Sequence, residues 1–203
     1  MSQHSQDFYQ FQFDASLSRV LQLVEVDGRK TKIEKITGNT FDIDTNASGA
    51  VTQVVRTEVS RQGTTEVSIY SDANGDQRFD KTFEIEVAGA SARQLEQHRF
   101  TFDNAGNVTA EMERKGNGAW KTERIDANEH FSQIQLDGVN YLVKTEQERD
   151  GIEFTLLRDD NGDGIWTQIA EGETTGLHID SATGTIDLVG IQAYLASADT
   201  IVG

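Results

Sequence analysis

Hydrophobic and polar residues alternate along most of the chain, in short runs that end at turn-forming residues. In the run Phe83–Val87, phenylalanine, isoleucine and valine alternate with two glutamates, which is the period of two expected of a strand with one face in water. Asn-Gly and Asp-Gly pairs, which favour tight hairpins, separate such runs at residues 27–28, 117–118, 137–138 and 150–151. Because turns recur about every ten residues, the pattern predicts antiparallel hairpins.

The predicted fold is therefore all-β, an antiparallel meander of repeated hairpins with about 12 to 15 strands. The meander could form either an elongated sheet or a barrel, and it could consist of two similar halves. In the run Val108–Met112 the alternating hydrophobic residues are Val108, Ala110 and Met112. Two short segments, Ala90–Gln97 and Gly190–Ser197, are the only ones whose pattern is compatible with a helix.

One stretch of the chain occurs twice. Val55–Glu58 matches Val143–Glu146, and the acidic loop Asp72–Asp76 matches Asp159–Asp163 after a one-residue deletion. Because the matches extend beyond the turn residues, we expect a duplication, although similar hairpins could also converge on similar residues. The repeat predicts a half with the first acidic loop at residues 1–88, a half with the second loop at residues 89–176, and a C-terminal hairpin segment at residues 177–203.

Composition narrows the classes of partner. The chain carries 34 acidic and 18 basic residues, a formal net charge of −16. Such a charge repels phosphate backbones and anionic membranes, so we expect no nucleic-acid partner, whereas metal cations are favoured. The chain lacks cysteine, which excludes disulfides and thiolate metal sites. No window approaches eighteen apolar residues, so membrane insertion is not expected.

The second acidic loop, Asp159–Gly164, has the pattern Asp-Asp-Asn-Gly-Asp-Gly. Oxygen side chains at positions 1, 3 and 5 of a tightly wound loop can converge on a hard cation such as Ca²⁺, and glycine at position 6 permits the sharp turn. The predicted ligands are Asp159, Asn161 and Asp163, with Thr167 as a weaker candidate. The alternative is a plain turn whose aspartates hydrogen-bond their own backbone.

The first acidic loop offers a similar set of oxygen atoms at positions 1, 3, 5 and 9. Its position 6 is Gln77 where the second loop has glycine, and Arg78 adds an opposing charge. Ca²⁺ binding and a plain turn are again the two interpretations. The predicted ligands of this loop are Asp72, Asn74, Asp76 and Asp80.

The residues that flank both loops are strand-like, so each loop is expected to close a hairpin. This arrangement resembles the calcium loops of FG-GAP hairpins and, more loosely, those of dockerin-like repeats. The resemblance covers about a dozen residues per loop, and it implies Ca²⁺ as the cofactor. It extends to no family for the whole chain.

The end of the sequence, from Leu177 to Gly203, closes with an acidic residue followed by hydroxyl and aliphatic residues. This ending is similar to the C-terminal signals of substrates of bacterial type I secretion. The resemblance implies an extracellular or cell-surface protein without an N-terminal signal peptide. Calcium loops fit this route, because they would stabilise the fold only where free Ca²⁺ is plentiful. A cytoplasmic protein with an ordinary hydrophobic tail is the alternative.

Motifs of nucleotide-binding loops, serine hydrolases and zinc proteases are absent from the sequence, so we expect no enzyme. The leading prediction is a secreted or surface-associated bacterial Ca²⁺-binding β protein with a structural, adhesive or ligand-capture role, acting on a protein or cell-surface ligand. The alternative is a β-barrel binding module for a small hydrophobic ligand or a partner protein, with the acidic loops as plain turns.

Overall fold

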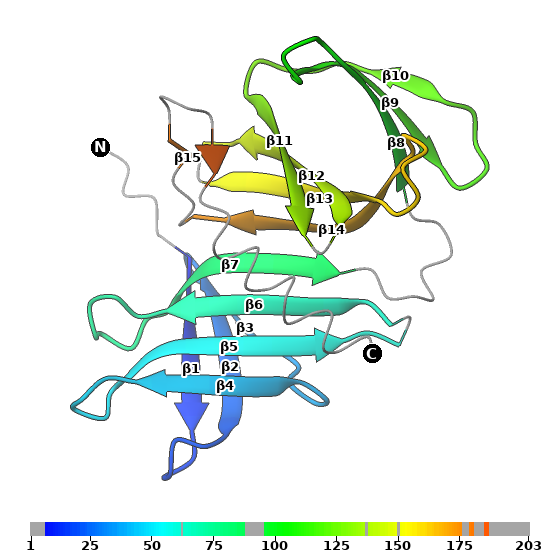
Figure 1. Cartoon of the computed structure of the whole chain (residues 1–203). Helices are drawn as coiled ribbons and strands as arrows, with labels where there is room; N and C mark the ends of the chain where they lie inside the picture. The colour runs from blue at the N-terminus through cyan, green and yellow to red at the C-terminus, as the bar shows by residue number, and fades with distance from the viewer. Residues whose placement is uncertain are drawn as a thin grey trace.

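The structure is a computed structural model, and it describes residues 7–61, 63–87, 96–136, 138–149, 151–175, 179–180 and 185–186. These residues form strands and turns and contain no helix, so the all-β prediction is confirmed (Figure 1). Glu96 and Gln97, at the end of the first segment considered for a helix, belong to a strand instead. The second such segment, at residues 190–197, lies outside the described residues.

The described strands number sixteen, and short turns join most of them. Their bounds are β1 (Phe8–Phe13), β2 (Val20–Asp27), β3 (Lys30–Ile33), β4 (Thr40–Thr45), β5 (Val51–Val59), β6 (Thr65–Ser71), β7 (Asp80–Val87), β8 (Glu96–Phe102), β9 (Val108–Lys115), β10 (Lys121–Glu123), β11 (Glu129–Leu136), β12 (Val139–Gln147), β13 (Ile152–Asp159), β14 (Trp166–Thr174), β15 (Ile179–Asp180) and β16 (Thr185–Ile186). The last two pair antiparallel with each other.

Eight strands form a continuous antiparallel stack in the order β4-β5-β6-β7-β14-β13-β12-β11 (Figure 1). One edge of strand β14 pairs with two different strands. Its residues Ala170–Thr174 pair with β7, whereas Trp166 and Thr167 pair with β8, which carries β9 and β10. The eleven-stranded sheet is therefore open, and the barrel considered from the sequence is not formed, because β14 divides its edge between two neighbours that diverge.

Strands β1, β2 and β3 form a separate sheet. It meets the large sheet where Tyr9 and Phe79 exchange two backbone hydrogen bonds, of 2.8 and 2.9 Å. In the second half, His98 of β8 and Trp166 of β14 pair in the same way. In the first half, the layer of β1, β2 and β3 therefore contacts the chain at the start of β7. In the second half, the layer of β8, β9 and β10 contacts the start of β14. Both β7 and β14 directly follow an acidic loop.

The correspondence between the halves includes most of their irregularities, although the bulge of β4–β5 at Thr52 has no counterpart in β11–β12. In the β6–β7 pair, Ile69 opposes Phe83 and Tyr70 opposes Lys81, so Thr82 is a bulge. In the β13–β14 pair, Leu156 opposes Ala170 and Leu157 opposes Gln168, so Ile169 is the corresponding bulge. The β1–β2 pair has a bulge at Leu21, and the β8–β9 pair has the corresponding bulge at Thr109. Bulges depend on local backbone geometry, and their recurrence supports duplication of the whole seven-stranded unit.

The two halves join through their last strands in a self-complementary way. In the pairing of β7 with β14, Phe83 opposes Thr174, Val87 opposes Ala170, and Ile85 opposes Gly172 at the centre. The shared bulge makes Phe83 equivalent to Ala170 and Val87 equivalent to Thr174. Equivalent residues therefore exchange partners across the junction, as in a two-fold symmetric dimer interface.

The hydrophobic core consists of three clusters. In the first half, Val54, Tyr70 and Phe79 are buried beneath the aromatic residues of β1. In the second half, Leu142, Leu157 and Trp166 occupy the equivalent positions and contact Phe100, Phe102 and Phe131. A third cluster spans the junction, where Ile85 packs with Val143, Phe154 and Leu156.

Candidate metal-binding loops

The two acidic loops occupy equivalent positions in the two halves. One connects β6 to β7, and the other connects β13 to β14. Because β7 and β14 run antiparallel, the loops lie at opposite ends of this strand pair (Figure 1). Any cations held in the two loops would therefore be bound independently.

In the second loop, the carboxylate of Asp159 accepts hydrogen bonds from the backbone N–H groups of Gly162 (2.8 Å) and Gly164 (3.1 Å). The side chain of Asn161 accepts from the N–H of Asp163 (3.1 Å), and Asp163 accepts from the N–H of Ile165 (2.8 Å). The structure thus brings the three predicted ligands together in one turn. Each of them faces backbone N–H groups.

The first loop repeats this arrangement. The carboxylate of Asp72 accepts from the N–H groups of Gly75 (2.7 Å), Asp76 (3.2 Å) and Gln77 (2.9 Å). The side chain of Asn74 accepts from the N–H of Asp76 (3.0 Å). Gln77 has a φ of 66° and Gly164, its equivalent, has a φ of 76°. The loop conformation is therefore kept even where a side chain makes a positive φ unfavourable.

Basic side chains near the loops are directed elsewhere. The guanidinium of Arg78 lies over the ring of Phe8, 4.8 Å from its centre. Arg158 pairs with Asp160, at 2.6 Å, outside the three predicted ligands. Within the described part of the chain, Asp72, Asp76, Asp159 and Asp163 form no ion pair. Asp72 and Asp159 are nevertheless buried, with exposed fractions of 5% and 7%.

The two outlying candidates lie in strands. Asp80 begins β7 opposite Ser71, and its side chain lines a cavity beside Asp7 and Tyr9. Thr167 pairs with Gln97 of β8 and with Arg158 of β13. Across the described residues, no three carboxylate or imidazole side chains converge into a group able to hold a metal ion. In each loop, two aspartates and one asparagine of the predicted set lie in the turn itself, and the ligand roles of all the candidates, Asp80 and Thr167 included, remain predictions.

A buried charge network in the second half was not foreseen from the sequence. Glu111, 1% exposed, accepts from Lys144 (3.0 Å) and lies 2.8 Å from Nδ1 of His98. Lys144 also pairs with Glu129 at 2.8 Å. Although burial opposes the charge, the hydrogen bonds from His98 and Lys144 lower the pKa of Glu111. The equivalent first-half residues are Tyr9, Leu23 and Arg56, so the second half has a histidine and a glutamate where the first half has a tyrosine and a leucine.

In a neighbouring pair of carboxyl groups, Glu96 and Glu113, the two pKa values shift in opposite directions. A hydrogen bond with Glu96, together with burial, raises the pKa of Glu113 to about 6. The same contact, helped by Lys115, lowers the pKa of Glu96 against the effect of its own burial. The two groups are close enough that both are not readily ionised together.

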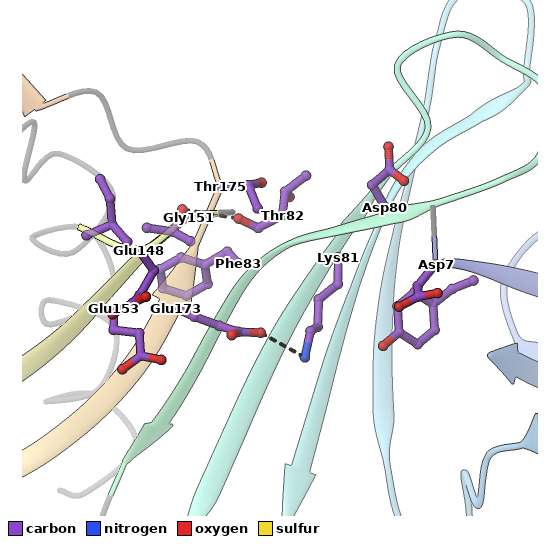
Figure 2. A pocket seen from close by; sticks show the side chains of 13 residues that line it. Asp7, Asp80, Lys81, Thr82, Phe83, Glu148, Gly151, Glu153, Glu173 and Thr175 are labelled. Atoms are coloured by element: carbon purple, nitrogen blue, oxygen red, sulfur yellow. Dashed lines mark hydrogen bonds and ion pairs between the residues drawn. The ribbon is translucent and has the colours of Figure 1, made fainter. Parts of the chain in front are cut away.

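A cavity of about 670 Å³ opens where the two halves meet (Figure 2). Phe83, Ile152 and Tyr9 provide apolar surface, and the remainder is lined by five carboxylates, three threonines, a glycine and Lys81. Lys81 extends into this space and pairs with Glu173 at 3.1 Å and with Glu84 at 2.9 Å. Although burial opposes its charge, these hydrogen bonds raise the pKa of Lys81. The lining thus combines apolar and charged groups, and the small hydrophobic ligand considered from the sequence stays an alternative.

No helix among the described residues is long and apolar enough to cross a membrane. The C-terminal segment that resembles a secretion signal lies outside the described residues, apart from the short strands β15 and β16. Comparison of the chain with protein-family models, with curated proteins and with solved structures finds no match.

Proposed function

We propose that the protein binds Ca²⁺ through its two Asp-x-Asn-Gly-Asp loops and serves a structural, adhesive or ligand-capture role at the cell surface or outside the cell. The observation that supports this proposal is the pair of buried aspartates, Asp72 and Asp159, at equivalent positions in the two halves. Each is compensated by backbone N–H groups and, among the described residues, by no basic side chain. A buried carboxylate of this kind is stabilised further by a cation.

The carboxylates keep free acceptor capacity for such a cation. An ionised aspartate offers about four lone-pair positions, and Asp159 uses two of them for backbone N–H groups. Oxygen atoms of Asn161 and Asp163 lie in the same turn. Ca²⁺ takes six to eight oxygen ligands in flexible geometry, so backbone carbonyls and water would complete the shell.

Thermal unfolding in excess Ca²⁺ against excess chelator tests the proposal. At free Ca²⁺ about 100-fold above the dissociation constant, one site adds about 2.7 kcal/mol to the free energy of unfolding. For a chain of this size the melting temperature would rise by roughly 5–10 °C. Asp163→Ala is expected to remove the contribution of the second loop.

Asp103→Asn provides a matched control. Asp103 also accepts hydrogen bonds from backbone N–H groups of its own turn, those of Ala105 (2.8 Å) and Asn107 (2.9 Å), but its turn contains no second carboxylate. This variant should keep the full calcium effect. Equal melting temperatures of the wild type with Ca²⁺ and with chelator would reject the proposal in favour of plain turns.

The cavity at the junction supports a second candidate function, that of a binding module for a partner protein. The proposal includes no catalytic role. The cavity combines apolar and acidic surface, and such a combination suits recognition of a positively charged partner. Because the surface around the cavity is acidic, the expected partner carries basic side chains.

A further inference from the structure

Two rows of glutamates run across the junction of the halves. Within each row, the residues of neighbouring strands stand directly opposite one another. We call them the glutamate rows. The first consists of Glu58, Glu66, Glu86 and Glu171, and the second of Glu146, Glu153, Glu173 and Glu84.

The glutamate rows lie side by side on one face of the sheet. Glu84 and Glu86 are alternate residues of β7 and belong to different rows, so the rows are separated by about 6.8 Å along the strands. Within a row the strands are about 4.8 Å apart, so four glutamates span about 14 Å. Each residue of one row has its duplicate in the other, for example Glu58 and Glu146, so both halves build the surface.

Few basic side chains offset this charge. Arg56 pairs with Glu58, and Lys81 pairs with Glu84 and Glu173. The other five glutamates form no ion pair among the described residues. Burial, and then repulsion from neighbours that include Glu146 and Glu173, raises the pKa of Glu153. Like charges directly opposite in a sheet destabilise it, so the five glutamates without an ion pair reduce the stability of the fold.

The cavity adjoins the middle of the second row and adds apolar surface to it. Glu153 and Glu173 belong to the row and also line the cavity, whose wall includes Phe83 and Ile152 (Figure 2). The equivalents of Lys81 and Phe83 on the other side of the junction are Gln168 and Ala170, so the site is not simply repeated. An apolar wall beside several carboxylates suits an aliphatic arm that ends in a cation.

We propose that the glutamate rows and the adjoining cavity bind an extended basic peptide segment of a partner protein. In an extended peptide, alternate side chains lie about 6.8 Å apart, which equals the separation of the two rows. Neighbouring carboxylates within a row can then contact one arginine guanidinium from two sides. The cavity receives the aliphatic part of a further basic side chain against Phe83. This surface is distinct from the calcium loops.

Binding of a short fluorescein-labelled peptide with arginine at every second position, followed by fluorescence anisotropy in excess chelator, tests the proposal. The variant Glu86→Gln/Glu153→Gln removes one exposed carboxylate from each row and breaks no ion pair of the described structure. It should weaken binding about tenfold, as expected for the loss of two close charge partners. Its melting temperature should rise, because repulsion is relieved, so misfolding cannot account for the loss.

The matched control is Asp42→Asn/Asp44→Asn, which makes the same change in net charge on exposed positions of β4. It should weaken binding less than about twofold, since exposed charges beyond the Debye length are screened. Equal weakening by both double variants would show general attraction to an acidic protein and overturn the proposal. So would binding that does not saturate.

Two further outcomes would reassign the surface. If free spermine binds with the same dependence on Glu86 and Glu153 while the peptide does not bind, the occupant is a polyamine and the peptide proposal is wrong. If the double variant instead loses Ca²⁺ binding in a titration without peptide, the rows are a cation site. Loss of Ca²⁺ binding in Asp163→Ala with peptide binding retained would leave the proposal intact.

Discussion

The ring of Phe154 occupies the space that a side chain on Gly172 would need. Its Cζ atom lies 2.7 Å from the position of a Cβ on Gly172, and the carbonyl oxygen of Glu84 lies closer still. Gly172 stands at the centre of the β7–β14 junction, opposite Ile85. Close packing of the two halves therefore depends on the absence of a side chain at this one position.

Gly172→Ala should destabilise the fold by about 3 kcal/mol or more, because both neighbours are held in the packed core and cannot move aside cheaply. Gly63→Ala is the control. Gly63 has a φ of +86° and nothing within 4 Å of an added Cβ, so its cost should be only about 1 kcal/mol. Urea denaturation of both variants measures the difference. Similar costs would contradict the packing argument.

Exchanging the residues at the sixth position of the two acidic loops, Gln77 and Gly164, should have opposite effects on stability. Gln77→Gly should stabilise the protein by about 0.5–1 kcal/mol, because Gln77 has a positive φ that glycine adopts without strain. Gly164→Gln should destabilise it by a similar amount. Both variants are to be measured in chelator, so that cation binding does not contribute. A destabilising Gln77→Gly would show that the Gln77 side chain makes a compensating contact.

The carboxyl pair of Glu96 and Glu113 predicts a pH dependence. The pKa of Glu113 is raised to about 6 in the folded protein, so the folded state binds this proton more tightly than the unfolded state. Its contribution to stability is present below the unfolded pKa of about 4.5 and is lost as the pH rises through 6. Glu113→Gln should therefore raise the melting temperature at pH 7.5 and change it little at pH 4.5. An equal effect at both pH values would contradict the raised pKa of Glu113.

The network of His98, Glu111 and Lys144 predicts that a single substitution costs more than a concerted one. Glu111→Gln should cost about 3 kcal/mol, because it leaves His98 without its buried carboxylate partner and Lys144 with Glu129 alone. Exchange of all three residues for those of the first half, in the variant His98→Tyr/Glu111→Leu/Lys144→Arg, should cost much less, since an apolar side chain replaces the buried carboxylate and the remaining cation keeps Glu129 as its partner. Chemical denaturation compares them. A triple variant weaker than the single one would show that the two halves are not equivalent here.

The hairpins could be predicted from the sequence because turn residues act locally. The backbone of Asp103–Asn107, for example, closes a turn through the N–H of Gly106 and the carbonyl of Asp103, 3.1 Å apart. Which residues of a strand face the core was harder to predict. A bulge at Thr109 shifts the alternation, so Glu111 is 1% exposed and Met112 is 36% exposed, although a simple period of two pairs Met112 with Val108 and Ala110.

The candidate sites divide in the same way. In each acidic loop the first three predicted ligands lie within five residues of one another, so their spacing alone predicted that Asp159, Asn161 and Asp163 would meet in one turn. The glutamate rows depend on the register between β7 and β14, in which Glu84 opposes Glu173. No local sequence pattern predicts the pairing of residues so far apart in the chain. The cavity depends on the same register.

The late position of β14 in the chain has a consequence for folding. Thr174 donates a hydrogen bond to the carbonyl of Thr82 across 92 residues. During synthesis, β7 therefore remains an unpaired edge, with Phe83, Ile85 and Val87 available to other chains, until β14 has emerged. Such long-range pairing is slow and prone to aggregation. The glutamates that alternate with those residues supply charge at this edge, and they would keep nascent chains apart until the second half arrives.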